Sequence, residues 1–163
     1  MPDPDIKQNR KQIAMDFIAE NKVAVLATVT PDNEPTAALV YYLFKPDNEF
    51  FFITKESSRK YSNLMHNKRA GIVIGTMDQP ITVQMQGSAE LFTDALELPK
   101  MREKMLRIAN GGSGAWPAVL RLPGNEPPVV LRITIDWMQL YDGRNLIHLG
   151  PEENKEAFTT IIP

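Results

Sequence analysis

The chain of 163 residues contains no cysteine, which excludes disulfides, thiolate catalysis and cysteine-ligated zinc. Its two histidines, His66 and His148, stand too far apart in the sequence to indicate a metal site. The formal net charge of -2 provides no positive field for nucleic acid or a membrane surface. No apolar run approaches the roughly 20 residues of a membrane-spanning helix, and the acidic N-terminus does not resemble a signal peptide. These absences predict one cytoplasmic domain over residues 1–163, with no metal, nucleic-acid or membrane partner.

The pattern of apolar residues predicts a mainly β protein with flanking helices. Amphipathic periodicity indicates helices, and runs rich in β-branched or aromatic residues indicate strands. The run from Val23 to Val29 is almost continuously apolar, which is typical of a strand covered on both faces. The expected helices span 5–21, 58–66 and 95–109; the expected strands span 23–29, 36–44, 50–54, 70–75, 81–92 and 129–141. Six antiparallel strands predict a closed or partly closed β-barrel, and the residues after the sixth strand look irregular.

Two of the turns share the tripeptide Pro-Asp-Asn, at residues 31–33 and 46–48. Proline presets the first corner of such a turn, and asparagine tolerates the left-handed conformation that follows it. The turns therefore predict that the first three strands form an antiparallel meander.

Alternation assigns faces to the last two expected strands. In the fifth strand, Gln84 and Gln86 alternate with apolar residues, so they either contact a ligand or face water, and water is favoured for Gln84. In the sixth strand the same spacing places Ile133, Ile135 and Trp137 on one face, where Trp137 would pack in the core or in an interface.

The segment Ser58-Arg59-Lys60 stands where a strand is followed by a helix. Ser57 or Ser58 can cap that helix, but its first turn then carries two cations where the helix dipole favours acidic residues. A bound anion would resolve this conflict, because backbone N–H groups, a hydroxyl, a guanidinium and an ammonium group would converge on it. The alternative is that Arg59 and Lys60 are solvated surface cations. The residues alone leave both interpretations open.

A wider pattern surrounds this segment. It runs from Ala27-Thr28-Val29 and Pro35, through Phe52-Ile53-Thr54 and Ser58-Arg59-Lys60, to Gln86-Gly87-Ser88-Ala89-Glu90-Leu91. This pattern resembles the pyridoxamine 5'-phosphate oxidase family and its FMN-binding split-barrel relatives. The resemblance is clear over residues 13–92 and fainter beyond them. It implies a six-stranded split β-barrel that acts as a homodimer, with FMN at the dimer interface.

The resemblance also implies which residues would hold the cofactor. Arg59 and Lys60 would contact the FMN phosphate, with Ile53, Thr54 and Ser58 beside them. The stretch Ala38-Leu39-Val40-Tyr41 would lie along the isoalloxazine ring, and Thr82 would lie near its polar edge. Trp116, in a loop after Gly114, is a candidate to cover the ligand.

The sequence departs from the oxidase itself at several positions. The family's arginine and lysine that flank the ring-binding stretch are Ala38 and Leu43 here, and its flavin-contacting glutamine is Thr82. The late Arg-Leu-His-Asp-Arg segment that holds the substrate phosphate has no counterpart, since residues 145–150 supply only His148. The resemblance therefore implies that pyridoxamine phosphate is not the substrate.

We expect an FMN-binding flavoprotein that acts as an oxidoreductase on an unidentified small molecule. No residue is an evident catalytic acid or base, which agrees with a reaction carried by the cofactor. The same scaffold could instead hold a deazaflavin. From a different class, it could be a non-catalytic flavin or haem-related binder, such as a stress-linked carrier, or a dimerisation scaffold with an empty site. The sequence leaves these alternatives open.

Overall fold

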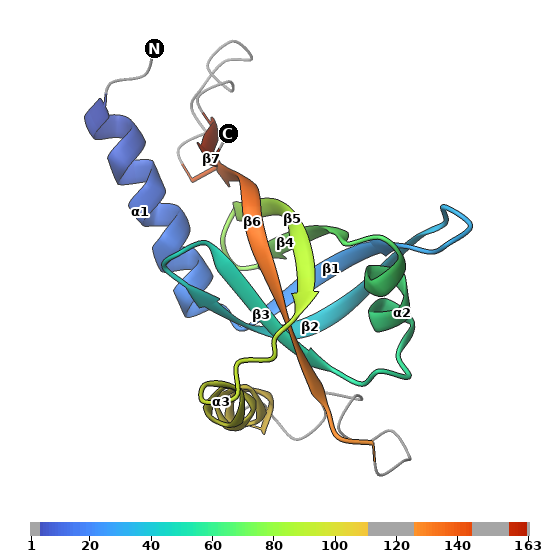
Figure 1. Ribbon diagram of the computed structural model, residues 1–163. Coiled ribbons are helices and arrows are strands. Elements are labelled where there is room, and N and C mark those ends of the chain that lie inside the picture. The colour runs from blue at the N-terminus through green and yellow to red at the C-terminus, as the bar shows by residue number, and fades with distance from the viewer. Residues whose placement is uncertain (1–3, 111–125, 145–156, 163) are drawn as a thin grey trace.

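The computed structural model of the protein describes residues 4–110, 126–144 and 157–162 (Figure 1). The helices are α1 (Pro4–Glu20), α2 (Arg59–His66) and α3 (Leu98–Asn110). The strands are β1 (Val23–Val29), β2 (Pro35–Lys45), β3 (Glu49–Thr54), β4 (Arg69–Gly75), β5 (Ile81–Leu91), β6 (Val129–Asp142) and β7 (Phe158–Ile162). None of the described helices is long and apolar enough to span a bilayer.

The strands form an antiparallel barrel. Their order is β3-β2-β1-β4-β5-β6, and β6 pairs again with β3, which closes six strands into a barrel. The predicted fold class is therefore confirmed. The expectation of an irregular C-terminal region is wrong for β7, which pairs with the later part of β6, where Tyr141 lies opposite Phe158. A strand of five residues that pairs along one edge leaves little pattern in the sequence.

The expected meander of β1, β2 and β3 is present, and its two turns have the predicted conformation. Asn33 and Asn48 are the non-glycine residues of the described chain with positive φ, at 63° and 61°. Each asparagine follows a Pro-Asp pair and takes the left-handed position that its short polar side chain tolerates.

Strand β3 is buried on both faces because it lies between the barrel interior and α3 (Figure 1). Phe50 and Phe52 point into the barrel and join its main hydrophobic core. Phe51 points outward and packs against Met101 and Met105 of α3. All three phenylalanine rings are fully buried, so β3 stabilises both layers at once.

Helix α1 is fastened to the barrel through its last turn. The Tyr42 hydroxyl on β2 donates a 2.6 Å hydrogen bond to the Ile18 carbonyl, which has no helical partner so close to the end of α1. Phe17 and Ile18 are buried beside it. Burial raises the pKa of Tyr42, so the phenol stays protonated and remains a donor at neutral pH.

A bulge between β5 and β6 changes the predicted face of Trp137. Gln86 lies opposite Trp137 and Gly87 lies opposite Ile135, so Asp136 is an extra residue in β6. Beyond Asp136 the alternation resumes with the opposite phase, and Trp137 is half-buried on the outer side of the barrel. The expectation that Trp137 continues the buried face of Ile135 is wrong, because alternation alone does not reveal a bulge.

The bulge predicts that Gly87 cannot be replaced by alanine without loss of stability. A Cβ atom at Gly87 would lie 2.3 Å from the Thr134 carbonyl oxygen and 2.7 Å from the Ile133 Cγ2, so the strands would have to separate. We expect Gly87→Ala to lower the free energy of unfolding by about 1–3 kcal/mol, measured by urea denaturation. Gly71→Ala is the matched control, because its Cβ would meet only the Cβ of Ala27, at 3.7 Å. Equal stability of the two variants would contradict the close approach of β6 to Gly87.

Candidate functional site

The end of β3 and the start of α2 form a corner that we call the phosphate corner, after the FMN phosphate that the sequence resemblance implies there; it is composed of Thr54, Ser57, Ser58, Arg59 and Lys60. Ser58 caps α2: its Oγ accepts a 3.3 Å hydrogen bond from the Tyr61 N–H. The Thr54 Oγ1 lies 2.8 Å from the same Ser58 Oγ. Because Thr54 is fully buried, this bond fixes the start of the helix to the end of the strand. The predicted helix cap is therefore confirmed.

Arg59 and Lys60 open α2, whose first turn contains no acidic residue. Within the described ranges neither side chain forms an ion pair. Arg59 is exposed, whereas Lys60 is half-buried, and burial lowers the pKa of the Lys60 amine. An anion at this helix N-terminus would offset the desolvation of Lys60 and its repulsion from the helix dipole. The corner therefore has the donors and the charge of an anion site.

A buried polar cluster holds α2 against the barrel. The Asn63 side-chain amide donates to the Thr28 Oγ1 at 2.9 Å and to the Thr36 Oγ1 at 3.0 Å, and these two hydroxyls lie 2.9 Å apart. Asn63 is 2% exposed, so each of its two donors is used inside the protein. The cluster joins α2 to both β1 and β2 and fixes the position of the phosphate corner. Sequence reasoning missed Asn63; its signal was a polar residue beside Leu64 on the face that covers the barrel.

The stretch Ala38–Tyr41 lies on an open edge of β2. From Pro35 to Tyr41 this strand pairs with β1, whereas its pairing with β3 begins only at Tyr42. The Tyr42 N–H donates to the Lys22 carbonyl on the β1 side. The alternation of an antiparallel ladder then turns the N–H groups of Leu39 and Tyr41 to the other side, where no described strand lies.

This open edge runs between two fixed points. The cluster of Asn63 holds the Thr36 end of β2 to α2, and the pairing with β3 holds the Tyr42 end. No described strand pairs with this edge between them, so its backbone N–H and C=O groups are available to a ligand.

The side chains of the same stretch divide between two faces. Ala38 and Val40 face the barrel interior, since they lie opposite the buried residues of β1, whereas Leu39 and Tyr41 face outward. A hollow of about 240 Å³ lies here, lined by Val23, Leu39, Val40 and Tyr41. Three of the four predicted residues, Leu39, Val40 and Tyr41, thus border one apolar hollow, whereas Ala38 does not line it.

Residues 11–142 match the model of the pyridoxamine 5'-phosphate oxidase family, which covers most of the chain. The chain belongs to this family. No curated protein matches the sequence.

Solved structures share this fold. A conserved hypothetical protein from Mycobacterium tuberculosis superposes with a TM-score of 0.65 at 25% identity, over 85% of this chain and 89% of its own. An FAD-binding protein from Mesorhizobium loti gives a TM-score of 0.62 at 18% identity, over 79% and 90% of the two chains. General Stress Protein 26 from Bacillus anthracis gives 0.60 at 19% identity, over 80% and 92%. At these lower identities the likeness concerns the fold alone.

The side chains of Leu43 and Ile53 lie under α3 rather than at the phosphate corner. Leu43, which stands where the resemblance places a lysine of the oxidase, packs against the cluster that contains Phe51. The side chain of Ile53 lies in the same cluster and is 6% exposed, so only its backbone is near the phosphate corner. Leu43, which stands where the resemblance places a lysine, therefore helps to pack α3 against the barrel.

The structure does not bring Thr82 to the phosphate corner within one chain. Thr82 lies opposite Gly75 and Tyr141, whereas β4 leaves α2 at its other end, at Arg69. Trp116 and His148 lie outside the described residues. A contact of Thr82 or Trp116 with a cofactor therefore stays a prediction.

The outward side of β2, β1 and β4 carries an exposed apolar surface, which we call the outer face. Its members Val23, Val25, Leu39 and Val73 are 38–49% exposed. A hollow of about 470 Å³ lies over these four residues and their neighbours. The expectation that Val23–Val29 is covered on both faces is therefore wrong for a single chain, because β1 alternates between exposed and buried residues. Contiguous apolar surface of this kind indicates an interaction site.

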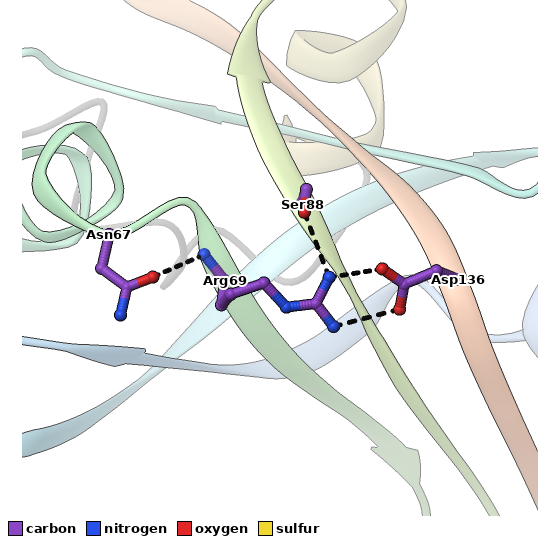
Figure 2. A network of polar contacts seen from close by, with 4 residues as sticks. All are labelled: Asn67, Arg69, Ser88 and Asp136. Atoms are coloured by element: carbon purple, nitrogen blue, oxygen red, sulfur yellow. Dashed lines mark hydrogen bonds and ion pairs between the residues drawn. The ribbon is translucent and has the colours of Figure 1, made fainter.

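A polar cluster joins β4, β5 and β6 through Arg69, Ser88 and Asp136 (Figure 2). The Arg69 guanidinium donates a 3.1 Å hydrogen bond to the Ser88 Oγ. Both of its terminal nitrogens also donate hydrogen bonds to the Asp136 carboxylate. Arg69 lowers the pKa of Asp136, which is the extra residue of the bulge in β6. Both side chains are about half exposed, so the pair contributes little stability and mainly fixes the orientation of Arg69.

The buried cluster at α2 predicts a loss of stability on removal of the Asn63 amide. Asn63→Ala would deprive the Thr28 and Thr36 hydroxyls of their donor, and we expect the free energy of unfolding to fall by about 1–3 kcal/mol in urea denaturation. Ser62→Ala is the matched control, because Ser62 is exposed on the same helix and alanine has a similar effect on helix propensity there. Equal stability of the two variants would show that the cluster does not hold α2.

Proposed function

We propose that the protein is a flavoprotein that holds the phosphate of FMN at the phosphate corner. The observation that carries the proposal is the pair Arg59 and Lys60, which stand in the first turn of a serine-capped helix without an acidic partner in the described chain. Membership of the pyridoxamine 5'-phosphate oxidase family and the FAD-binding protein among its structural neighbours support a flavin.

The proposed activity is that of an oxidoreductase acting on a small molecule. Bound FMN would supply hydride or electron transfer, and the chain would supply position and electrostatics. Arg59 and Lys60 would neutralise the phosphate, and the backbone of Leu39 and Tyr41 would orient the ring. The apolar lining around Leu39, together with the missing substrate-phosphate segment, argues against pyridoxamine phosphate as the substrate.

We also propose that two copies of the chain associate through the outer face. Cover by a second copy would remove this exposed apolar surface from water, which is favourable. The surface contains Val23, Val25, Leu39 and Val73. Leu39 belongs both to this face and to the stretch expected along the ring. A dimer formed here would therefore place the flavin at the boundary between the two copies and would allow the partner to supply a distant residue such as Thr82.

A second candidate function is a flavin carrier without turnover. The observation that favours it is the FAD-binding protein from Mesorhizobium loti among the structural neighbours, because that protein is named for flavin binding and not for a reaction. Reduction of the bound flavin by a nicotinamide nucleotide, with repeated turnover on an electron acceptor, distinguishes the enzyme from the carrier.

The proposal predicts that the corner cations determine FMN affinity. Each charge-assisted hydrogen bond to phosphate contributes roughly 1.5–3 kcal/mol, so Arg59→Ala combined with Lys60→Ala should weaken FMN binding about a hundredfold or more. Flavin fluorescence titration measures this change. Lys68→Ala is the control for loss of a surface cation, because Lys68 is exposed and lies beyond the end of α2. A wild-type protein that stays colourless after incubation with FMN would refute the flavin proposal itself.

The proposed dimer predicts that one charge on the outer face separates the two copies. Val73→Lys would place an ammonium group at a residue that is 41% exposed in the single chain and covered in the dimer. We expect this variant to sediment as a monomer in analytical ultracentrifugation and the wild type as a dimer. Leu96→Lys is the control, because Leu96 is 82% exposed and lies before α3, away from the outer face. A monomeric wild type would contradict the dimer.

A further inference from the structure

Glu126 lies against the phosphate corner although α2, β4, β5 and α3 separate the two in the sequence. Its Oε1 accepts a 3.1 Å hydrogen bond from the Ser57 N–H, and its Oε2 accepts a 2.7 Å hydrogen bond from the Ser57 hydroxyl. The closure of the barrel explains this contact. The β3–β6 ladder ends where Thr54 lies opposite Val129, and Ser57 and Glu126 each lie three residues farther along from that pair.

The Glu126 carboxylate is bound in the way that two oxygens of a phosphate would be. A backbone N–H and a hydroxyl just before a helix cap are typical donors to an anion. Ser57 immediately precedes the cap Ser58, so the carboxylate occupies two donors at the start of the helix that Arg59 and Lys60 open. No ion pair joins Glu126 to either cation in the described chain. Glu126 therefore uses donors of the corner without neutralising it.

We propose that Glu126 is an internal anion that competes with the cofactor phosphate at this corner. The inference rests on the proposed flavin function and adds a determinant of affinity to it. A bound phosphate meets a negative charge beside it and finds the donors of Ser57 already in use. Glu126 thereby weakens the hold on the phosphate and makes the cofactor easier to release. The flavin ring and ribityl chain carry no charge, so the competition acts on the phosphate alone.

The test compares Glu126→Gln with Glu56→Gln. Glutamine at position 126 keeps the size of the side chain and removes its charge. Glu56 is an exposed glutamate next to Ser57, so Glu56→Gln removes a charge from the same turn and leaves the Glu126 contact intact. We expect Glu126→Gln to bind FMN about three- to tenfold more tightly than the wild type, measured by flavin fluorescence titration. Riboflavin, which lacks the phosphate, should bind both variants as it binds the wild type.

Each outcome of this comparison decides the proposal. Unchanged or weaker FMN binding by Glu126→Gln, beside a wild type that binds FMN, overturns the competition and leaves the flavin function standing. Equal tightening in Glu56→Gln, or equal tightening toward riboflavin, also overturns it, because neither change involves this contact with the phosphate. Failure of all three proteins to bind FMN overturns the flavin function and the competition together. Glu126→Ala repeats the test, and circular dichroism confirms the fold of each variant.

Discussion

Six residue pairs between β3 and β6, from Glu49 opposite Thr134 to Thr54 opposite Val129, join segments far apart in the sequence. Such long-range pairing has a high entropic cost of loop closure, which burial must offset. The offset comes from Phe50, Phe51 and Phe52, whose rings fill the barrel and the space under α3. This closure places the end of β3 where α2 can start from it. The phosphate corner and the contact of Glu126 both depend on this closure.

The outward side of the barrel carries different kinds of side chain on different groups of strands. Across β3, β6 and β5, Arg132 bridges Glu49 and Glu90, and α3 covers the adjoining apolar residues. Across β2, β1 and β4, the exposed large apolar side chains are those of Val23, Val25, Leu39 and Val73, and these belong to neither buried cluster of the described residues. Association through this side would therefore remove aliphatic side chains from contact with water. The open edge of β2 borders that same side, so cofactor and partner would meet there.

The sequence predicts most elements of this structure because local chemistry decides them. The Pro-Asp-Asn turns require a left-handed asparagine, and Ser58 supplies the cap that the start of α2 needs. The features that escaped prediction depend on contacts between distant segments. The bulge at Asp136 turns the Trp137 side chain to the outward side of the barrel. The role of Asn63 depends on its hydrogen bonds to Thr28 and Thr36, which lie far from it in the sequence.

The same limit applies to the candidate site. Arg59 and Lys60 could be singled out because two cations conflict with the dipole of the helix they open. Glu126 could not, because its position follows from the register of two strands that are remote in the chain. Likewise, the apolar run of β1 predicted a strand covered on both faces, but a single chain covers only one of them.

The position of Trp137 on the outward side of β6 has an optical consequence. It is the one tryptophan among the described residues, and it lies half-buried opposite the exposed Gln86. Indole fluorescence responds to the polarity of its surroundings, and its emission overlaps the absorption of flavins. In a variant without the second tryptophan, Trp116, the emission wavelength of Trp137 would therefore report the polarity on the outward side of β6, and the proposed flavin would quench that emission if it bound nearby.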